Sequence, residues 1–328
     1  MVKKKIAFVT GGYSSEAQVS YRSAETIKAN IDPDKYDHFT IDIRKDGWWY
    51  TMPDGSEISV DKNDFTIKPA GEKVVFDAVL IGIHGTPGED GKLQGYFDML
   101  GLPYTTCDAS VSALTFNKRF TVGVAAFSGI SVSRSLHFYK GDKIDAENIA
   151  LQLNFPVFVK PANGGSSLGM SKVPDVAGID AAMEKAFAED DQVLVEEFIE
   201  GREFTVGVCR LGGAITTLPI TEVITENYFF DYEAKYLGKS KEITPAEIGE
   251  EVAEKIRAEA RKIYSVFNCR GVIRIDFIYN ELAGKPFMLE INTVPGQSAA
   301  SVVPQQVRAM GWNLRDFYSE LIEAAFYK

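Results

Sequence analysis

The chain has 328 residues, of which 45% are hydrophobic and 25% charged, proportions that are ordinary for a globular protein with a sizeable core. Its net charge of −11 argues against a nucleic-acid duplex or a membrane surface as the main partner, because both are polyanions. Three cysteines without metal-ligand spacing, and no apolar run of signal-peptide or transmembrane length, predict a cytoplasmic protein.

The first hundred residues alternate between strand and helix patterns. Apolar runs predict strands over residues 5–10, 36–43 and 76–83, and helical spacing predicts helices over 16–30 and 91–100. An aromatic, hairpin-like stretch surrounds Trp48 and Trp49. This βαβ order predicts an open, mainly parallel sheet that binds ligands at the carboxyl ends of its strands.

Beyond Cys107 the pattern becomes that of a mixed protein with antiparallel strands. We expect helices over 110–128, 179–189 and 246–267, strands over 192–198, 203–210, 214–224, 271–279 and 286–293, a loop over 225–245, and a C-terminal helix. A loop of about 20 residues inside a compact domain is uncommon unless it is functional, which favours a lid.

Residues 158–170 read FVKPANGGSSLGM and are rich in glycine. Such turns bring several backbone N–H groups close to one anion. A P-loop would continue with lysine, Ser/Thr and a helix, whereas the residues up to Pro174 predict a second short strand. Two interpretations follow from these residues alone, a phosphate-binding loop of another kind and a flexible hairpin turn.

The segment 271–292 predicts a hairpin with polar residues on one face. Side chains alternate along a strand, so Arg274 shares a face with Asp276, and Glu290 shares one with Asn292. A turn over residues 281–285, centred on Ala283, places Asp276 opposite Glu290 and Arg274 opposite Asn292.

Two neighbouring carboxylates are costly unless a cation lies between them. Their oxygens, with an amide oxygen, are ligands that suit Mg²⁺. The alternative for this hairpin is an exposed network of salt bridges, which contributes little to stability.

Two lysines upstream, Lys118 and Lys160, would disperse the charge of a triphosphate beside such a metal. The stretch 193–199, VLVEEFI, offers apolar contacts and glutamates to a purine and a ribose. Each feature also has an ordinary structural explanation. Either lysine alone is typical of a surface charge, and the stretch 193–199 alone is typical of a strand that ends in an acidic turn.

The ordered set of motifs resembles an ATP-grasp carboxylate–amine ligase. It comprises Lys118 followed by KPANGGSSLGM, VLVEEFIEGREF, YEAKY, RIDF and LEINTVPG. The segments GGYSSEAQVS and IHGTPGEDGKLQG, the second around His84, narrow the resemblance to the D-alanine–D-alanine ligases. The resemblance spans essentially the whole chain.

The resemblance implies an open parallel α/β domain over residues 1–106, followed by a two-domain ATP-grasp fold over 107–196 and 197–328. ATP lies between two antiparallel sheets, and the glycine-rich hairpin covers its triphosphate. The implied cofactors are ATP, as co-substrate, and two Mg²⁺ or Mn²⁺ ions, and the implied assembly is a homodimer.

The implied reaction has two steps and serves peptidoglycan synthesis. The carboxylate of one D-alanine attacks the γ-phosphate of ATP, which gives D-alanyl phosphate and ADP. The amine of a second D-alanine then displaces phosphate. Positioning and charge stabilisation suffice for this chemistry, and no enzyme nucleophile is required.

The resemblance also assigns roles to individual residues. ATP is assigned to Lys118, Lys160, Ser167, Glu196, Phe198, Ile199 and Glu203, and the metal to Asp276, Glu290 and Asn292. The substrates are assigned to Glu16 for the first ammonium, His84, and Ser301 with the backbone near Val302 for the second carboxylate. The remaining catalytic assignments are Arg274 and the Gly296 N–H at the oxyanion, Lys235 at the transferring phosphate, and Ser166 and Tyr236 in a triad with Glu16.

Tyrosine at position 236 goes with D-alanine as the second substrate in this family, and ligases that use D-lactate or D-serine are the main alternative. Two segments depart from the family pattern. The loop after the metal ligands has Gln297 in place of a usual methionine and Val302 in place of a usual leucine, and the segment before Lys118 has Asn117 in place of a common aspartate. Neither departure falls on a residue with a direct chemical role.

Two further alternatives are weaker. A dinucleotide-dependent oxidoreductase would require a full G-x-G-x-x-G turn, which GGYSSE lacks, although Asp42 is available at the second strand. A non-catalytic nucleotide sensor would have lost some of the assigned residues, and none is lost.

Overall fold

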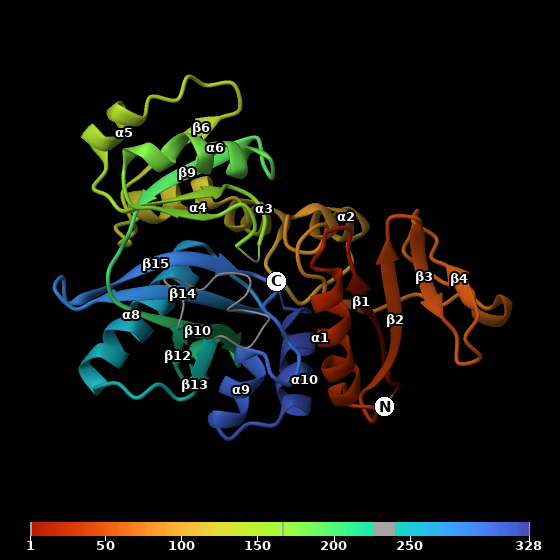
Figure 1. Ribbon diagram of the computed structural model, residues 1–328. Helices are drawn as coiled ribbons and strands as arrows, with labels where there is room; N and C mark the ends of the chain where they lie inside the picture. Colours follow the sequence, from red (N-terminus) through yellow and green to blue (C-terminus); the bar gives the residue numbers. More distant parts are fainter. Residues whose placement is uncertain (1, 166, 226–239, 328) are drawn as a thin grey trace.

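The computed structural model describes residues 2–165, 167–225 and 240–327. It contains three β-sheets with helices packed on them, so the predicted mixed α/β class is confirmed. In Figure 1 the second sheet in chain order lies above the third, and the first sheet lies to the right of the third. None of the helices in these ranges is long and apolar enough to cross a membrane.

The first sheet has the strand order β4-β3-β2-β1-β5. Its strands are β1 (Lys4–Gly11), β2 (Tyr36–Arg44), β3 (Gly47–Thr51), β4 (Glu57–Ser59) and β5 (Ala78–Ile81). The strand β1 pairs in parallel with β2 and β5, as predicted, whereas β3 and β4 extend the sheet as antiparallel strands. The helices α1 (Ala17–Asn30) and α2 (Lys92–Leu100) follow β1 and β5. Residues that come after β1 and β5 therefore meet at one edge of the sheet.

The second sheet is antiparallel, with the order β6-β9-β7-β8. Its strands are β6 (Ser135–Tyr139), β7 (Val157–Pro161), β8 (Ser171–Val173) and β9 (Gln192–Glu197). The helices α5 (Ala146–Gln152) and α6 (Ile179–Phe187) pack on it through a shared apolar cluster. Because β7 pairs with β8, the glycine-rich segment is the turn of a hairpin, as predicted.

The third sheet has the order β13-β12-β10-β14-β15, and β11 also pairs with β10. Its strands are β10 (Arg202–Leu211), β11 (Ala214–Thr217), β12 (Thr221–Thr225), β13 (Ser240–Ile243), β14 (Val272–Asn280) and β15 (Lys285–Asn292). Helix α8 (Glu250–Val266) packs on this sheet in one apolar cluster. Helices α9 (Val302–Ala309) and α10 (Leu314–Ala324) join it to α1 and β1 in another cluster.

Several predicted boundaries are wrong. The helix predicted over 110–128 is two helices, α3 (Ala109–Phe116) and α4 (Lys118–Phe127), because Asn117 has an extended backbone and caps α4 with its side chain. The strand predicted over 214–224 is two strands, β11 and β12. Helix α5 was not predicted, and part of the predicted loop over 225–245 is the strand β13.

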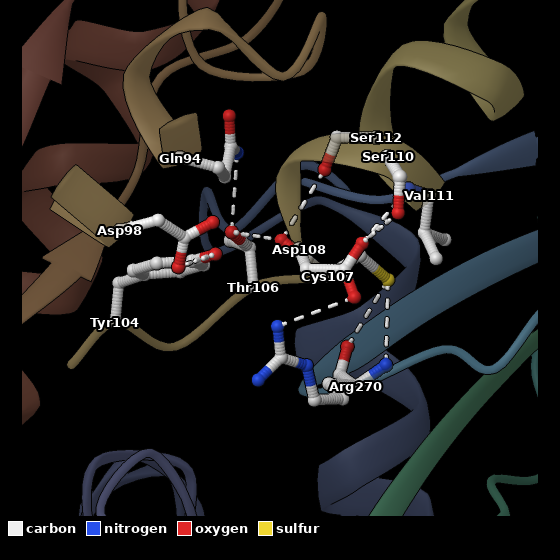
Figure 2. Close-up of polar contacts among 10 residues, drawn as sticks. All are labelled: Gln94, Asp98, Tyr104, Thr106, Cys107, Asp108, Ser110, Val111, Ser112 and Arg270. Carbon is white, nitrogen blue, oxygen red and sulfur yellow. Dashed lines mark hydrogen bonds and ion pairs between the residues drawn. The ribbon is translucent and has the colours of Figure 1, made fainter. Parts of the chain in front are cut away.

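A polar junction ties the first sheet to the third, and Figure 2 shows its members. Arg270, just before β14, forms an ion pair with Asp108 at 3.5 Å, and its backbone N–H donates to Cys107 Sγ at 3.4 Å. The next residue, Gly271, has φ +65°, and a Cβ there would lie 2.0 Å from the carbonyl oxygen of Thr105. The two chain segments therefore approach too closely for any side chain at this glycine.

We expect the substitution Gly271→Ala to destabilise the protein by about 2–4 kcal/mol, because it adds a clash with backbone to an unfavourable φ. Gly284→Ala is the matched control. Gly284 has φ +63°, and a Cβ placed on it would have no heavy atom within 4 Å. This control substitution should therefore cost only about 1 kcal/mol. Thermal unfolding of both variants measures the difference, and equal losses would contradict the close approach.

Candidate active site

Two adjoining cavities lie at the meeting point of the three sheets. The first, here called the hairpin cavity, has a volume of about 400 Å³ and lies between the β7–β8 hairpin and the third sheet. The second, the loop cavity, has about 360 Å³ and is bounded by the loop after β15. The cavities share the lining residues Lys118, Gly164, Gly165, Glu203, Val223, Asp276 and Glu290.

Every predicted site residue that the structure describes lines one of these cavities. The hairpin cavity holds Lys118, Lys160, Ser167, Glu196, Phe198, Ile199, Glu203, Asp276 and Glu290. The loop cavity holds Glu16, His84, Arg274, Asn292, Gly296, Ser301 and Val302. Ser166, Lys235 and Tyr236 lie outside the described residues, so the triad of Glu16, Ser166 and Tyr236 stays a prediction, as does the contact of Lys235 with the phosphate.

The far wall of the hairpin cavity combines a buried ion pair with an aromatic ring. Lys160 on β7 pairs with Glu196 on the neighbouring strand β9, and both side chains are buried. Phe198 supplies the ring, and Lys172 on β8, which is outside the cavity lining, places its Nζ 3.7 Å from the centroid of that ring. Lys172 was not predicted, because its position facing the ring depends on the β7–β8 register. This wall offers a flat apolar contact next to charge, which suits an aromatic base.

The glycine-rich hairpin is anchored at the side where Lys118 lies. The backbone N–H of Lys118 donates to Ala162 at 2.8 Å, and its Nζ donates to the carbonyl of Gly164 at 2.7 Å. The Asn117 side chain donates to Asn163 at 3.1 Å. The departure at residue 117 therefore serves to fix the base of this hairpin.

The turn of the hairpin reaches the first sheet. A Cβ on Gly165 would lie 2.4 Å from Glu16 Oε1, so only glycine allows the carboxylate of Glu16 to approach this backbone. Glu16 is the N-cap residue of α1 and does not cap it with its side chain. Its carboxylate instead borders the loop cavity.

The predicted register of the β14–β15 hairpin is confirmed. Asp276 pairs with Glu290 and Arg274 with Asn292. The predicted five-residue turn is wrong in detail, because Lys285 already pairs with Asn280 and a register shift follows Asp276. Leu289 on β15 has no partner on β14 and forms a bulge. The shorter turn and this bulge together place Asp276 opposite Glu290, as the symmetric five-residue turn would.

Asp276 is the centre of the polar patch on this hairpin. It accepts from Arg274 Nε at 2.9 Å and Nη2 at 2.8 Å, from Thr205 Oγ1 at 2.5 Å and from Asn292 Nδ2 at 3.2 Å. Arg274 Nη2 also lies 4.0 Å from Glu290 Oε1. Thr205 was not predicted, because its contact follows from the β10–β14 pairing, which a linear pattern does not reveal.

This patch has the oxygen donors that a divalent cation requires. Glu290 and Asp276 face each other across the strand pair, and Asn292 uses its amide nitrogen toward Asp276, which leaves its amide oxygen for a metal. The described residues contain no cluster of three or more His, Cys, Asp or Glu side chains arranged around a metal position. The three oxygen donors Asp276, Glu290 and Asn292 fit Mg²⁺ that completes its shell with phosphate oxygens and water.

His84 lies at the carboxyl end of β5 and is held by α1. Its backbone N–H donates to Ser20 Oγ at 2.9 Å, and its Nε2 lies 3.0 Å from Ser23 Oγ. Burial, together with the positive charge of Arg274, lowers the pKa of His84 to about 4. The imidazole is therefore neutral at physiological pH, and it can orient a substrate without adding charge.

Glu89 is a site residue that the sequence analysis missed. Its carboxylate accepts from the N–H groups of Gly85 at 2.6 Å and Val294 at 3.2 Å. Burial raises the pKa of Glu89 well above its usual range, and the negative charge of Glu16 adds to this effect. Two carboxylates on one cavity need a proton or a cation between them, and an ammonium group meets that need.

The opposite wall of the loop cavity is the N-terminus of α9. Ser301 is its N-cap residue and Val302 its first residue. Ser301 Oγ lies 2.8 Å from Ser298 Oγ, and a Cβ on Gly296 would lie 2.9 Å from Ser301 Oγ. A hydroxyl and backbone N–H groups at a helix N-terminus form a suitable site for a carboxylate.

Comparisons with known proteins agree with this geometry. Family models described as D-ala D-ala ligase N-terminus and D-ala D-ala ligase C-terminus match residues 5–107 and 118–323. A D-alanine–D-alanine ligase of Parabacteroides distasonis is 46% identical over 98% of this chain and 97% of its own.

Solved structures show the same likeness. VanG D-Ala:D-Ser ligase from Enterococcus faecalis superposes with a TM-score of 0.89 at 31% identity, over 99% of this chain and 100% of its own. A D-alanine–D-alanine ligase from Bacillus anthracis complexed with ATP gives a TM-score of 0.79 at 25% identity, over 98% and 97% of the two chains.

Proposed function

This chain belongs to the D-alanine–D-alanine ligase family, and we propose that it joins two D-alanine molecules with ATP through a D-alanyl phosphate, for peptidoglycan precursor synthesis. The observation that carries the proposal is the pair of adjoining cavities. One combines lysines with an aromatic wall, the other combines carboxylates with a helix N-terminus, and the Arg274–Asp276–Glu290 patch lies where they meet.

In the hairpin cavity, ATP would place its base near Phe198 and Ile199, its ribose near Glu203, and its phosphates near Lys118 and Lys160. The glycine-rich hairpin, with Ser167, would cover the triphosphate. Asp276, Glu290 and Asn292 would hold two Mg²⁺ or Mn²⁺ ions, which supply charge neutralisation at the phosphates.

In the first step, Glu16 would bind the ammonium of the first D-alanine and so orient its carboxylate toward the γ-phosphorus. The new bond joins a carboxylate oxygen to phosphorus, and the bond from phosphorus to ADP breaks. The cations Lys118, Lys160 and Arg274 disperse the negative charge of this transfer.

In the second step, Ser301 and the N–H groups at the start of α9 would hold the carboxylate of the second D-alanine. Its neutral amine attacks the acyl carbonyl, and the carbonyl oxygen becomes an oxyanion between Arg274 and the Gly296 N–H. The oxyanion then collapses as the bond from the carbonyl carbon to the phosphate oxygen breaks, and the proton lost by the amine leaves with the phosphate. Neutral His84 would orient a substrate on the first-sheet side, next to Glu89.

We further propose the three-domain division at 1–106, 107–196 and 197–328 and a homodimeric assembly. The separate second and third sheets support the division, with β9 ending close to its second boundary. The resemblance across the whole chain supports the dimer.

The proposal is tested by ADP and phosphate release from MgATP with D-alanine, with L-alanine, with D-alanine plus D-lactate or D-serine, and without an amino acid. We expect release that depends on D-alanine, with one ADP per dipeptide. The VanG likeness makes D-serine a necessary arm of this assay. ATP binding without turnover on any of these acids would contradict the proposal.

A further inference from the structure

A buried chain of hydrogen bonds lies behind the acceptor side of the loop cavity. It runs from Tyr318 on α10 through Gln297, in the loop after β15, to Ser23 on α1 and His84 after β5. All four side chains are buried. None of the roles assigned above uses Gln297, Tyr318 or Ser23.

Gln297 is the central residue of this hydrogen-bond chain. Its backbone N–H and both polar atoms of its side chain have hydrogen-bond partners. The backbone N–H donates to Ser23 Oγ at 3.1 Å, and Nε2 donates to the carbonyl of Pro295 at 3.1 Å. Its Oε1 accepts from the hydroxyl of Tyr318 at 3.0 Å. Burial raises the pKa of Tyr318, so this hydroxyl stays protonated and remains a donor.

These contacts hold the peptide groups on both sides of Gly296. Gly296 immediately precedes Gln297, and the Pro295 carbonyl that Gln297 holds immediately precedes Gly296. The direction of the Gly296 N–H is therefore fixed from both sides. Ser23 Oγ, which holds the Gln297 N–H, also lies 3.0 Å from His84 Nε2, so the same chain connects the loop to the imidazole that lines the cavity.

We infer that Gln297, held by Tyr318 and Ser23, is a positioning residue for the second half of the reaction. It acts through the loop, by aiming the Gly296 N–H, and it lines neither the hairpin cavity nor the loop cavity. The inference rests on the proposed function. Methionine matches glutamine in size but offers no oxygen to the Tyr318 hydroxyl, so Gln297→Met removes this hydrogen bond while keeping the volume of the side chain.

The test compares wild type with Gln297→Met. Initial rates against D-alanine concentration give separate Michaelis constants for the first and second D-alanine. Oxygen-isotope scrambling within labelled ATP, at low D-alanine, reports phosphoryl transfer alone. We expect the Michaelis constant for the second D-alanine to rise about tenfold, because Gln297→Met removes one buried hydrogen bond and leaves the Tyr318 hydroxyl without its acceptor. The first constant and the scrambling rate should change less than about twofold by the same reasoning.

Two further variants separate positioning from stability. Gln306→Met removes another buried amide, one that bonds to Gly207, Thr205 and Thr221 in the sheet, and it should lower thermal stability without changing the ratio of the two constants. Tyr318→Phe should raise the second constant in the same direction as Gln297→Met. In the double variant Gln297→Met/Tyr318→Phe, the Michaelis constant for the second D-alanine should be no higher than in Gln297→Met, because both partners of the hydrogen bond are then apolar.

The possible outcomes distinguish failure of the proposed function from failure of this inference. Absence of D-alanine-dependent turnover in the wild type would contradict the proposed function. Normal turnover in the wild type, with a ratio of constants that neither Gln297→Met nor Tyr318→Phe changes, would contradict this inference alone. A ratio that Gln306→Met shifts equally would also overturn it, since the effect would then be general loosening of the structure.

Discussion

Replacing Arg274 by alanine should reduce dipeptide formation by about a thousandfold or more, since removal of a preorganised charge at a developing oxyanion has effects of this size. Arg274 is held by two hydrogen bonds to Asp276, and its Nη2 lies 4.0 Å from Glu290. The guanidinium is therefore fixed before any substrate binds. Its loss also leaves Asp276 and Glu290 facing each other without their cation.

The measurement is kcat and kcat/KM for D-alanine-dependent ADP release. Arg274→Lys should recover only part of the rate, because an ammonium keeps the charge but cannot reproduce the two-pronged contact. Arg270→Ala is the matched control, since Arg270 also forms an ion pair but lies outside both cavities. An Arg274→Ala enzyme that keeps about a tenth of the rate would contradict the role given to this residue.

Replacing Glu290 by glutamine should raise the Mg²⁺ concentration needed for half-maximal rate by at least about tenfold, together with a large fall in kcat. Glutamine keeps the size of the side chain but removes the charge that binds a hard cation. Glu290 is the residue of β15 that pairs with Asp276, and no other described carboxylate of β15 lies opposite Asp276.

The assay is a titration of activity with Mg²⁺ at fixed ATP. Glu323→Gln provides the control, because Glu323 pairs with Lys4 and lines neither cavity, so its loss should leave the Mg²⁺ dependence unchanged. A fall in kcat without any shift in the Mg²⁺ requirement would argue that Glu290 serves the local salt bridges and not a metal.

The hairpin that carries Arg274 and Glu290 shows how far sequence reasoning reaches. Alternation along two strands and a turn centred on Ala283 were enough to predict which side chains face each other. The bulge at Leu289 was not predictable, because nothing in the local residues distinguishes a five-residue turn from a shorter turn with a bulge.

Other differences have a similar origin in local structure. The helix break at Asn117 depends on a side-chain cap that competes with continuation of the helix, and both outcomes suit the same residues. The helix break helps to anchor the glycine-rich hairpin. It places Lys118 at the start of α4, where its backbone and its side chain both contact that hairpin.

Residues that act through long-range contacts were the ones missed. Glu89 lies within a motif that was noted for His84, but its bond to Val294 joins segments 205 positions apart. The chain from Tyr318 through Gln297 to Ser23 likewise joins the two ends of the sequence. Such contacts follow from how the sheets pack, and no local pattern encodes them.

The identity of the product that the wild-type protein makes tests the proposed reaction most directly. Isotope-labelled D-alanine, offered with MgATP and equal concentrations of D-serine and D-lactate, is followed by mass spectrometry. We predict D-alanyl-D-alanine as the main product, with one ADP and one phosphate formed for each dipeptide. ATP consumption without this dipeptide, or a mixed product as the main species, would contradict this prediction.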